Sequence, residues 1–320
     1  MVKDLKSATD PSRNLYFDTA TLYYRAFFAV PESITAPDGT PSGAVRGFLD
    51  MVSAIAKQFP PKQVVFAWDD DWRPQWRVDL IPSYKLHRIE DQSLEQPDAA
   101  IEVVPDALSP QISAISLILD AIGLPRIGQI GHEADDVLGA LVAKSTQPCD
   151  VVTGDRDLFQ LVSDDSQVRV ISITKGVKNL EIVDDGYLEN RYGVTGEQYA
   201  DFSMLRGDPS DGLPGVKGIG EKTAAKLILE HKDLAGLLTA AKDSEVPLAP
   251  AVRRNLITSQ DYMKAASKVV RVKTTARLPK KLDCPSKVLD PQSLQDLTDA
   301  WGIERQVKRF LKTFNIEWVA

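Results

Sequence analysis

The sequence predicts an α/β protein with a mainly parallel central sheet flanked by helices, followed by a helical C-terminal region. Two observations support this prediction. Short apolar runs recur along the first half of the chain, with helical stretches between them, and each run leads into an aspartate. Such runs are typical of parallel strands that are buried on both faces. Beyond residue 200 the strand signals become sparse, which favours helices there.

Three apolar runs carry the predicted sheet: LYFD at 15–18, QVVFAWD at 63–69 and CDVVTGD at 149–155. Between the second and third, ISAISLILDAIGL at 112–124 predicts an apolar helix, because a glycine and a proline close it. We therefore expect a polar, disordered extension at 1–13, an α/β core at 14–200 and a helical region at 201–320. A polar stretch without periodicity, residues 80–108, interrupts the core. An insertion of that length is usually functional or disordered.

The composition is that of a soluble globular protein. The chain has 320 residues, of which 43% are hydrophobic and 26% charged, enough for one large domain or two ordinary ones. Its two cysteines, Cys149 and Cys284, are too few for a disulfide framework or a zinc site. No apolar run approaches the roughly 20 residues that span a bilayer, and no signal-peptide stretch opens the chain. We expect a cytoplasmic protein without membrane contact.

Each predicted strand delivers an acid to the same edge of the sheet. Asp18, Asp69 and Asp155 end the three apolar runs. In parallel sheets, ligands gather at the carboxyl ends of the strands. A single aspartate after a strand is usually a turn residue. Three in succession indicate a shared site.

A second acidic motif opens a predicted helix. GHEADDVLGALVA at 131–143 places Glu133, Asp135 and Asp136 in the first turn, where the positive end of the helix dipole favours anions. At about 100° per residue, the three side chains fit one arc of about 160°. Taken alone, ordinary acids at a helix start are an equally good interpretation. The motif is not that of a zincin, because no second histidine follows His132 at the required spacing.

Two further pairs of acids follow in VVTGDRDLFQLV and LRGDPSDGLPG. The full set has nine members: Asp18, Asp69, Glu133, Asp135, Asp136, Asp155, Asp157, Asp208 and Asp211. If they converge, each close pair costs on the order of 4 kcal/mol at an effective dielectric of about 20. Divalent cations with oxygen ligands, Mg²⁺ or Mn²⁺, relieve this repulsion. Two such ions roughly 4 Å apart can activate a water and stabilise the leaving oxygen of a phosphodiester. Leaving out the nine acids changes the net charge from −7 to +2, so the remaining protein is mildly basic.

LPGVKGIGEKTAAKLI at 213–228 predicts a DNA-binding helix-hairpin-helix. Gly218 and Gly220 would let the backbone approach a phosphate, and the free amides at the start of the second helix would bind it whatever the base sequence. Lys217 and Lys222 would neutralise phosphates. A tight helical turn without a ligand is the simpler alternative. The run lacks the terminal Gly-Lys-Ser/Thr of a P-loop, and its glycines do not follow a strand as those of a dinucleotide fold do.

Four motifs in this order, FDTATLYYR, GHEADDVLG, VVTGDRDLFQLV and GDPSDGLPGVKGIGEKTAAKLI, resemble the 5′-nuclease/flap endonuclease family. The likeness is to the N-terminal nuclease domain of bacterial DNA polymerase I, here as a stand-alone protein. It runs from about residue 15 to 230, and more loosely to about 300. The resemblance implies a PIN-like/5′-nuclease core with a C-terminal helix-hairpin-helix (H3TH) region. It also implies a metal-dependent 5′-3′ exonuclease and 5′-flap endonuclease that acts in replication or repair, for example by removing RNA primers.

The resemblance also assigns roles to residues. The tighter metal site would comprise Asp18, Asp69, Glu133, Asp135 and Asp136, and a second group, partly acting through water, would comprise Asp155, Asp157, Asp208 and Asp211. Two or three divalent cations are implied. Arg25 would lie near the scissile phosphate, and Lys85 would stabilise the transition state electrostatically. Tyr84 and Arg88 would assist with the end of the substrate. The hairpin would hold a K⁺ ion against a DNA phosphate.

Several alternatives stay open. Asp70 and Asp71 compete with Asp69 for one ligand position, and Asp69 is preferred because it directly ends the strand. The insertion carries many acids, namely Glu90, Asp91, Glu95, Asp98, Glu102 and Asp106. Such an arch would attract a single strand poorly, so a plain solvated loop is nearly as good an interpretation as a threading arch.

Three other interpretations share parts of this pattern. An inactive relative used as a DNA-binding module would be expected to lack some of the nine acids, and a PIN-like ribonuclease would usually lack the hairpin. Solvated acids without a shared site would predict no metal dependence. The expected substrates are 5′ flaps, 5′-recessed or nicked duplexes and RNA-DNA hybrids, bound by a monomer. The balance between exonuclease and flap cleavage, the preferred metal and any protein partner are left open.

Overall fold

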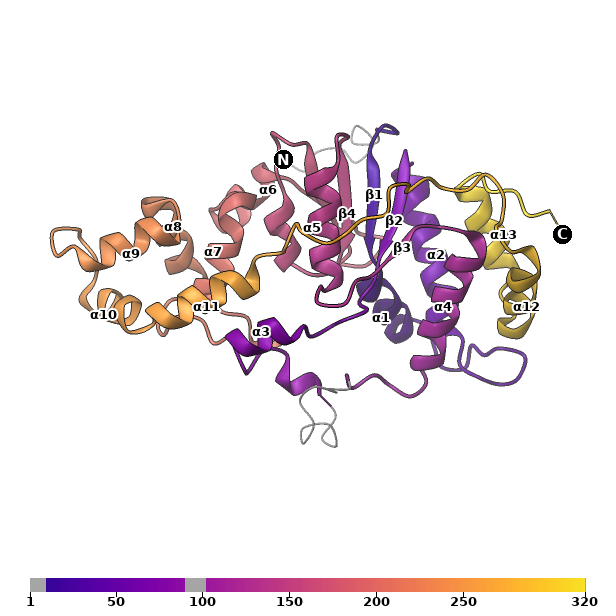
Figure 1. The fold of residues 1–320 in the computed structure, drawn as a ribbon, viewed down its shortest axis with the longest axis horizontal. Helices are drawn as coiled ribbons and strands as arrows, with labels where there is room; N and C mark the ends of the chain where they lie inside the picture. The colour runs from indigo at the N-terminus through magenta and orange to yellow at the C-terminus, as the bar shows by residue number, and fades with distance from the viewer. Residues whose placement is uncertain (1–9, 90–101, 320) are drawn as a thin grey trace.

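The computed structural model describes residues 10–89 and 102–319, and its centre is a six-stranded sheet (Figure 1). The strands are β1 (Asn14–Asp18), β2 (Gln63–Ala67), β3 (Arg126–Ile127), β4 (Cys149–Thr153), β5 (Val168–Ser172) and β6 (Glu181–Val183). Their order is β3-β2-β1-β4-β5-β6, and all neighbours are parallel except β5 and β6. The predicted α/β fold with a mainly parallel sheet is confirmed.

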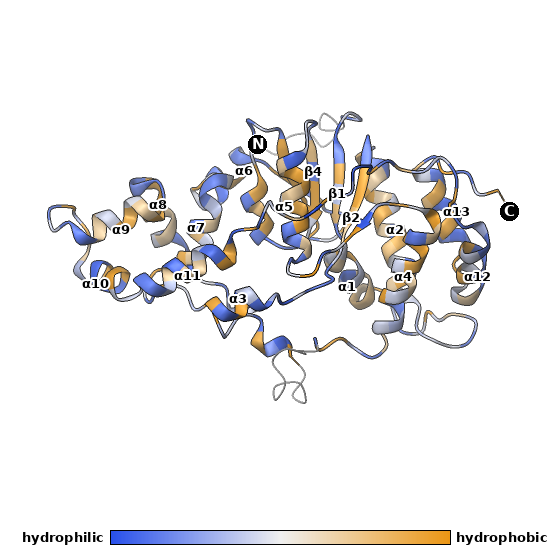
Figure 2. Cartoon of the chain, in the orientation of Figure 1, coloured by the Kyte–Doolittle hydropathy of each residue, from blue (hydrophilic) through white to orange (hydrophobic). Residues whose placement is uncertain are grey.

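Helices cover both faces of the sheet and extend beyond it. They are α1 (Thr19–Ala29), α2 (Gly43–Gln58), α3 (Gln75–Leu80), α4 (Ser109–Ile122), α5 (Ala134–Lys144), α6 (Asp185–Tyr192), α7 (Gly196–Arg206), α8 (Glu221–His231), α9 (Leu234–Lys242), α10 (Pro250–Thr258), α11 (Gln260–Val270), α12 (Pro291–Trp301) and α13 (Glu304–Thr313). Figure 2 shows apolar residues concentrated in the strands and in the helices packed against them. In the described ranges, no helix is both long and apolar enough to cross a bilayer.

The strands are apolar because both of their faces are buried. Tyr16 of β1 belongs to the core on the α5 side, whereas its neighbours Leu15 and Phe17 belong to the core on the side of α2 and α4. This alternation is the period of two that a strand imposes on its side chains. Phe17 stacks on Phe66 of β2, with ring centroids 5.2 Å apart. The three apolar runs of the sequence are therefore the middle strands of the sheet.

The order of the strands creates a crevice at their carboxyl ends. From β1 the chain adds β2 and β3 on one side, then crosses over and adds β4 and β5 on the other. The loops that follow β1 and β4 consequently diverge to opposite faces. Such a topological switch point is where open α/β sheets bind ligands.

The helical region predicted at 201–320 divides into two parts in the structure. Helices α7 to α11 extend from one end of the molecule, whereas α12 and α13 lie at the opposite end (Figure 1). Val307, Phe310 and Leu311 of α13 are buried in the core that α2 and α4 share. These side chains give α13 an apolar face that must be covered, and α2 covers it.

The structure also bears on the predicted N-terminal extension, residues 1–13, and on the predicted insertion, residues 80–108. Residues 1–9 of the expected extension lie outside the described residues, but Arg13 is held in place. Its Nε donates to Asp150 at 2.7 Å, and its Nη2 donates to two backbone carbonyls. The insertion is described up to residue 89 and again from 102, and Ile89 pairs with Glu102 across its base. The predicted arch or loop between them lies outside the described residues.

Candidate active site

Asp18 lies at the centre of the crevice, between β1 and β4. It is 4% exposed, and its Oδ2 accepts a hydrogen bond of 2.7 Å from the hydroxyl of Thr153, the last residue of β4. The amide of Asp155 donates to the same hydroxyl oxygen at 2.8 Å, so Thr153 links the two acids. Burial raises the pKa of Asp18 to about 7, and the charges of Asp69 and Asp155 contribute. Strand pairing thus brings acids distant in the sequence together.

The structure separates the three neighbouring aspartates after β2. Asp69 points to the start of α5, where its Oδ1 accepts from the Ala134 amide at 2.7 Å. Asp70 lies instead against Gly128, and Asp71 accepts from the Gly131 amide at 2.8 Å. Burial raises the pKa of Asp69, a shift that the charge of Lys85 opposes. The placement therefore favours Asp69 among the three as the member of the acid cluster.

Helix α5 begins with the predicted acids, but they face different partners. Glu133 is its N-cap residue and forms a capping box with Asp136. Asp135 is half-buried, and burial raises its pKa well above the ordinary value, with Asp155 and Asp18 adding to the shift. Asp136 is fully buried and bound by Arg77 through two hydrogen bonds of 2.8 and 3.0 Å.

This arrangement differs from the expected role of Asp136 as a metal ligand. Besides Arg77, its oxygens accept from the amides of Lys273 at 2.7 Å and Glu133 at 3.1 Å. Few lone pairs remain for an ion, since a carboxylate has about four. Asp136 thus holds Arg77 and the N-cap residue Glu133 in position. The sequence could not show that Arg77 binds Asp136, because the two residues lie 59 positions apart.

Tyr84 and Lys85 both contact Glu133. The Tyr84 hydroxyl donates to Glu133 Oε1 at 2.8 Å, and Lys85 Nζ donates to Oε2 at 2.5 Å. Although burial acts to raise the pKa of Glu133, the charges of Lys85 and Arg77 hold it below the ordinary value. Tyr84 is only 4% exposed and positions Glu133, so its expected contact with DNA stays a prediction.

The base of the insertion is tied to the loop that carries the last two acids. Arg88 Nη2 donates to Asp211 Oδ1 at 2.9 Å, and the Lys85 amide donates to the Asp211 carbonyl at 3.1 Å. The Ser83 hydroxyl donates to the Gly212 carbonyl at 2.8 Å. Gly212 has a φ of +71°, and a Cβ there would lie 2.0 Å from the Ser83 oxygen. Only glycine fits this contact, so the two segments are held together.

The remaining acids surround β4 and the following turn. Asp155 is exposed, and its Oδ1 accepts from the amide of Asp157 at 2.8 Å. Asp157 also accepts from the Ser203 hydroxyl at 3.0 Å, and burial followed by the charge of Asp155 raises its pKa well above the ordinary value. Asp208 accepts from the Ser210 amide at 2.8 Å. These acids come from β4 and from the loop before the hairpin.

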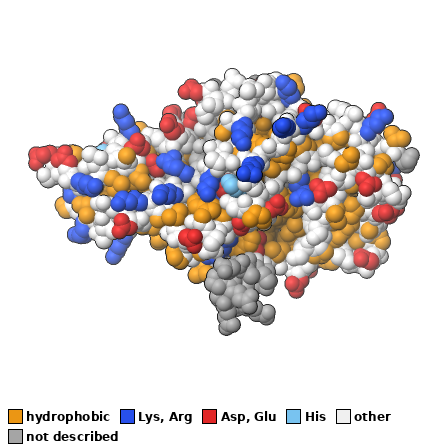
Figure 3. Space-filling view, in the orientation of Figure 1, with side chains coloured by type: hydrophobic (Ala, Val, Ile, Leu, Met, Phe, Trp, Pro, Cys, Tyr) orange, Lys and Arg blue, Asp and Glu red, His pale blue; other side chains and the backbone are white. Residues whose placement is uncertain are grey.

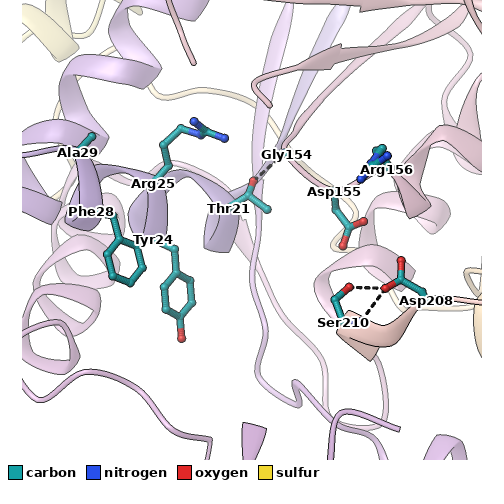
Figure 4. Close-up of a pocket in the computed structure, with 10 residues that line it drawn as sticks. All are labelled: Thr21, Tyr24, Arg25, Phe28, Ala29, Gly154, Asp155, Arg156, Asp208 and Ser210. Atoms are coloured by element: carbon teal, nitrogen blue, oxygen red, sulfur yellow. Dashed lines mark hydrogen bonds between the residues drawn. The ribbon is translucent and has the colours of Figure 1, made fainter. Parts of the chain in front are cut away.

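A cleft of about 650 Å³ opens beside these acids. Figure 4 shows Tyr24, Arg25 and Phe28 of α1 on one side, and Asp155 with Asp208 on the other. The predicted site residue Arg25 donates to the Thr174 carbonyl at 3.2 Å. Phe28 is 75% exposed. An aromatic side chain exposed next to a cleft is suited to stacking on a base.

Several residues of this site were missed in the sequence. Tyr24 and Phe28 sit in an apolar helix, where aromatic residues usually indicate core. Arg156 also lines the cleft, hidden between two acids of a motif. Glu102 adds a further half-buried acid, whose pKa is raised by burial and then by Asp69. The only available signal for it was its position in the acid-rich insertion.

The donor set fits hard divalent cations in chemistry. Among residues 10–89 and 102–319, no three carboxylate, imidazole or thiol groups are arranged as ligands of one ion. Lys85 and Arg77 hold Glu133, and Arg88 holds Asp211, so positive side chains already contact part of the cluster. Asp18, Asp69, Asp135 and Asp157 keep raised pKa values from burial in spite of these contacts. Carboxylate oxygens are the ligands that Mg²⁺ and Mn²⁺ prefer, and a bound cation would stabilise the charged form of these buried acids.

The predicted hairpin is exposed and opens a helix. Gly218 has a φ of +75°, and Gly220 is the N-cap residue of α8. Lys217 and Lys222 are exposed on either side. The segment before the glycines is a turn rather than the first of two short helices, since α7 ends at Arg206. The free amides at the start of α8 remain available to an anion.

Tyr84→Phe separates the positioning role of Tyr84 from the expected DNA contact. The change removes only the hydroxyl that Glu133 accepts. We expect cleavage at limiting metal to fall about tenfold, as for other partners of metal ligands, and to recover as the metal concentration rises. DNA affinity in EDTA should stay the same, because the ring is buried. A loss of affinity that metal does not correct would support the DNA contact instead.

Carboxylates that can hold divalent cations, next to a hairpin that can bind phosphate, suit the hydrolysis of a phosphodiester. The fold and the site thus define a nuclease.

Comparisons with known proteins agree with this class. A family model described as 5′-3′ exonuclease, N-terminal resolvase-like domain, matches residues 13–193, and one described as 5′-3′ exonuclease, C-terminal SAM fold, matches residues 194–292. The chain therefore belongs to the 5′-3′ exonuclease family. The two models meet ahead of α7, whereas the sequence placed the boundary at residue 200.

Individual relatives include both stand-alone and fused forms. A 5′-3′ exonuclease of Streptomyces coelicolor is 50% identical over 300 residues, covering 93% of this chain and 99% of the relative. DNA polymerase I of Mycobacterium tuberculosis is 36% identical over 246 residues, covering 76% of this chain and 25% of the polymerase. The flap endonuclease of bacteriophage T5, in a complex with DNA and metal ions, has a TM-score of 0.60 at 18% identity and covers 94% of this chain and 99% of its own. That likeness shows a shared fold.

Proposed function

We propose that this nuclease cleaves DNA at 5′ flaps and 5′ ends in a reaction that requires divalent cations. One observation carries the proposal: β1, the loop after β2, the start of α5 and the end of β4 all deliver carboxylates to the switch point of the sheet. Burial raises the pKa values of Asp18, Asp69 and Asp135, and the charges of neighbouring acids add to each shift. The T5 flap endonuclease, whose fold this chain shares, is described with DNA and metal ions bound.

The acids divide into two groups that would hold two ions, Mg²⁺ or Mn²⁺. Asp18, Asp69, Glu133 and Asp135 would hold one, and Asp155, Asp157, Asp208 and Asp211 would hold the other, some of them through water. Asp136 would position Glu133 and α5. Bound ions would supply a water of lowered pKa and stabilise the leaving oxygen.

Cationic side chains would bind the reacting phosphate. Burial alone would lower the pKa of Lys85, but Glu133 raises it, so its ammonium stays charged beside the cluster. An ammonium there can stabilise the charge of a transition-state phosphate. Arg25 from α1 lines the cleft, and Arg88 from the base of the insertion binds the neighbouring Asp211. Aromatic Phe28 would stack on a base next to the cleaved bond.

The hairpin would hold the duplex part of the substrate. Lys217, Gly218, Gly220 and Lys222 form an exposed site for a phosphate, and a K⁺ ion could bridge carbonyls of this turn to the DNA. We further propose that a monomer acts on nicked and 5′-recessed duplexes and on RNA-DNA hybrids. These are the substrates that arise when RNA primers are removed in replication or repair. The proposed place of this activity is the cytoplasm.

One assay tests this function and separates it from a ribonuclease. Flapped, nicked and single-stranded DNA, and the same substrates with an RNA 5′ segment, are incubated with Mg²⁺, Mn²⁺ or EDTA. We expect cleavage of the flapped and nicked duplexes with either metal, and none in EDTA. Product lengths report whether flap or exonuclease cleavage dominates. Activity that persists in EDTA, or that is confined to RNA, would contradict the proposal.

A further inference from the structure

A basic segment that does not line the cleft crosses one face of the molecule. Residues 271–282, which we call the basic strap, contain Arg271, Lys273, Arg277, Lys280 and Lys281 and no acid. The whole chain has a net charge of −7, so this concentration of positive charge is unusual within it. Figure 1 shows the strap passing in front of α5 and the sheet, and Figure 3 shows Lys and Arg side chains along the middle of that face.

The strap is fixed to the core by its backbone. The Lys273 amide donates to Asp136 at 2.7 Å, and the Arg277 amide donates to Gln129 at 2.6 Å. Lys144 Nζ donates to the Ala276 carbonyl at 2.8 Å. A Cβ on Gly139 of α5 would lie 2.9 Å from the Val272 side chain, so glycine allows the strap to lie close to the helix. An extended segment held this way presents its free side chains outward.

Three of the basic side chains are exposed and unused. In the part of the chain that the structure describes, Arg277, Lys280 and Lys281 form no ion pair or side-chain hydrogen bond. Arg271, in contrast, pairs with Asp201 at 2.7 Å. Uncompensated like charges on a fixed backbone repel one another, and the negative charges of a polyanion relieve this repulsion. Binding also releases counterions from the polyanion, which favours the complex.

We propose that the basic strap is a second nucleic-acid-binding surface, which holds the phosphate backbone of the substrate outside the cleft. Its first residues contact the back of α5, whose N-terminus carries Glu133 and Asp135, so a strand leaving the site can continue along it. From Arg277 to Lys281 an extended chain covers roughly 13 Å, a length over which nucleic acid presents several phosphates. The ligand is the single-stranded 5′ flap, because the strap begins next to the first turn of α5, where the acids lie. This inference rests on the proposed function for its substrate.

The test measures DNA binding in EDTA, where no cleavage occurs. The strap variant combines Arg277→Gln, Lys280→Gln and Lys281→Gln. A matched control, Lys57→Gln with Arg305→Gln and Lys312→Gln, removes the same charge from exposed positions on α2 and α13. The hairpin variant Lys217→Gln with Lys222→Gln serves as a comparison. Substrates are a duplex with a long 5′ flap, the same duplex with a one-nucleotide flap, and a single strand.

We expect the strap variant to bind the long-flap substrate about tenfold more weakly, with a salt slope reduced by about 2, while the control matches the wild type. A loss confined to the long flap and the single strand supports the flap as the ligand, whereas an equal loss on both duplexes would overturn that assignment in favour of a duplex arm. Equal affinities for the strap variant and the control would overturn the proposal. Metal-dependent cleavage by the wild type tests the function separately, so either can fail alone.

Discussion

Asp69→Asn should reduce cleavage of a 5′ flap by at least about a hundredfold, whereas Asp70→Asn and Asp71→Asn should stay within about threefold of the wild type. Only Asp69 points to α5 and the other acids. Asparagine keeps an oxygen that can accept from the Ala134 amide, so the fold is retained and only the charge is lost. Partners of metal ligands already contribute tenfold to a hundredfold, and a ligand itself contributes more.

The three variants are measured side by side as kcat/KM over a series of Mg²⁺ concentrations. A ligand loss should shift the metal dependence to higher concentration, and DNA affinity in EDTA should not weaken. If Asp71→Asn lost activity as Asp69→Asn is expected to, the assignment from geometry would be contradicted. The choice among three adjacent acids would then pass to Asp71.

Arg77→Met should lower the free energy of unfolding by about 3–5 kcal/mol, since it leaves the buried Asp136 without its cation and Glu133 with Lys85 alone. The Arg77 side chain is 3% exposed and lies 3.1 Å from Glu133 and 2.8 Å from Asp136. Its Nε also donates to the Val269 carbonyl at 3.2 Å. One guanidinium therefore joins α3, α5 and α11, and its removal loosens contacts between the core and the helical region.

Arg126→Met is the matched control. Arg126 also binds a carboxylate through two hydrogen bonds, those to Asp120 at 2.8 and 3.0 Å, but this pair is on the surface. Solvent screens it, so its loss should cost at most about 1 kcal/mol. Denaturant unfolding in EDTA, which excludes any stabilisation by bound metal, measures both. Equal losses in the two variants would show that burial of the Arg77 cluster does not determine its contribution.

Much of the fold could be predicted from local patterns. The runs at 15–18, 63–69 and 149–155 became β1, β2 and β4 because strands buried on both faces must be apolar. The helix predicted at 112–124 is α4, and the acidic motif opens α5 as expected. The amphipathic pattern near the C-terminus predicts helices packed on the body, but it could not show that α2 is the partner of α13, since an amphipathic helix specifies that it needs a partner but not which one.

The sequence by itself determined which residue types gather at the site: nine acids, eight of them in four motifs and Asp69 at the end of a strand, and a glycine hairpin with its lysines. Only the tertiary structure decided which charges meet. It turned Asp136 to Arg77, 59 residues away, and Asp211 to Arg88, 123 residues away, and it laid the basic strap across α5. The reason is physical. Spacing along the chain sets which residues share a helix face or a strand end, whereas the energy of a charge depends on its burial and on distances that the whole fold sets.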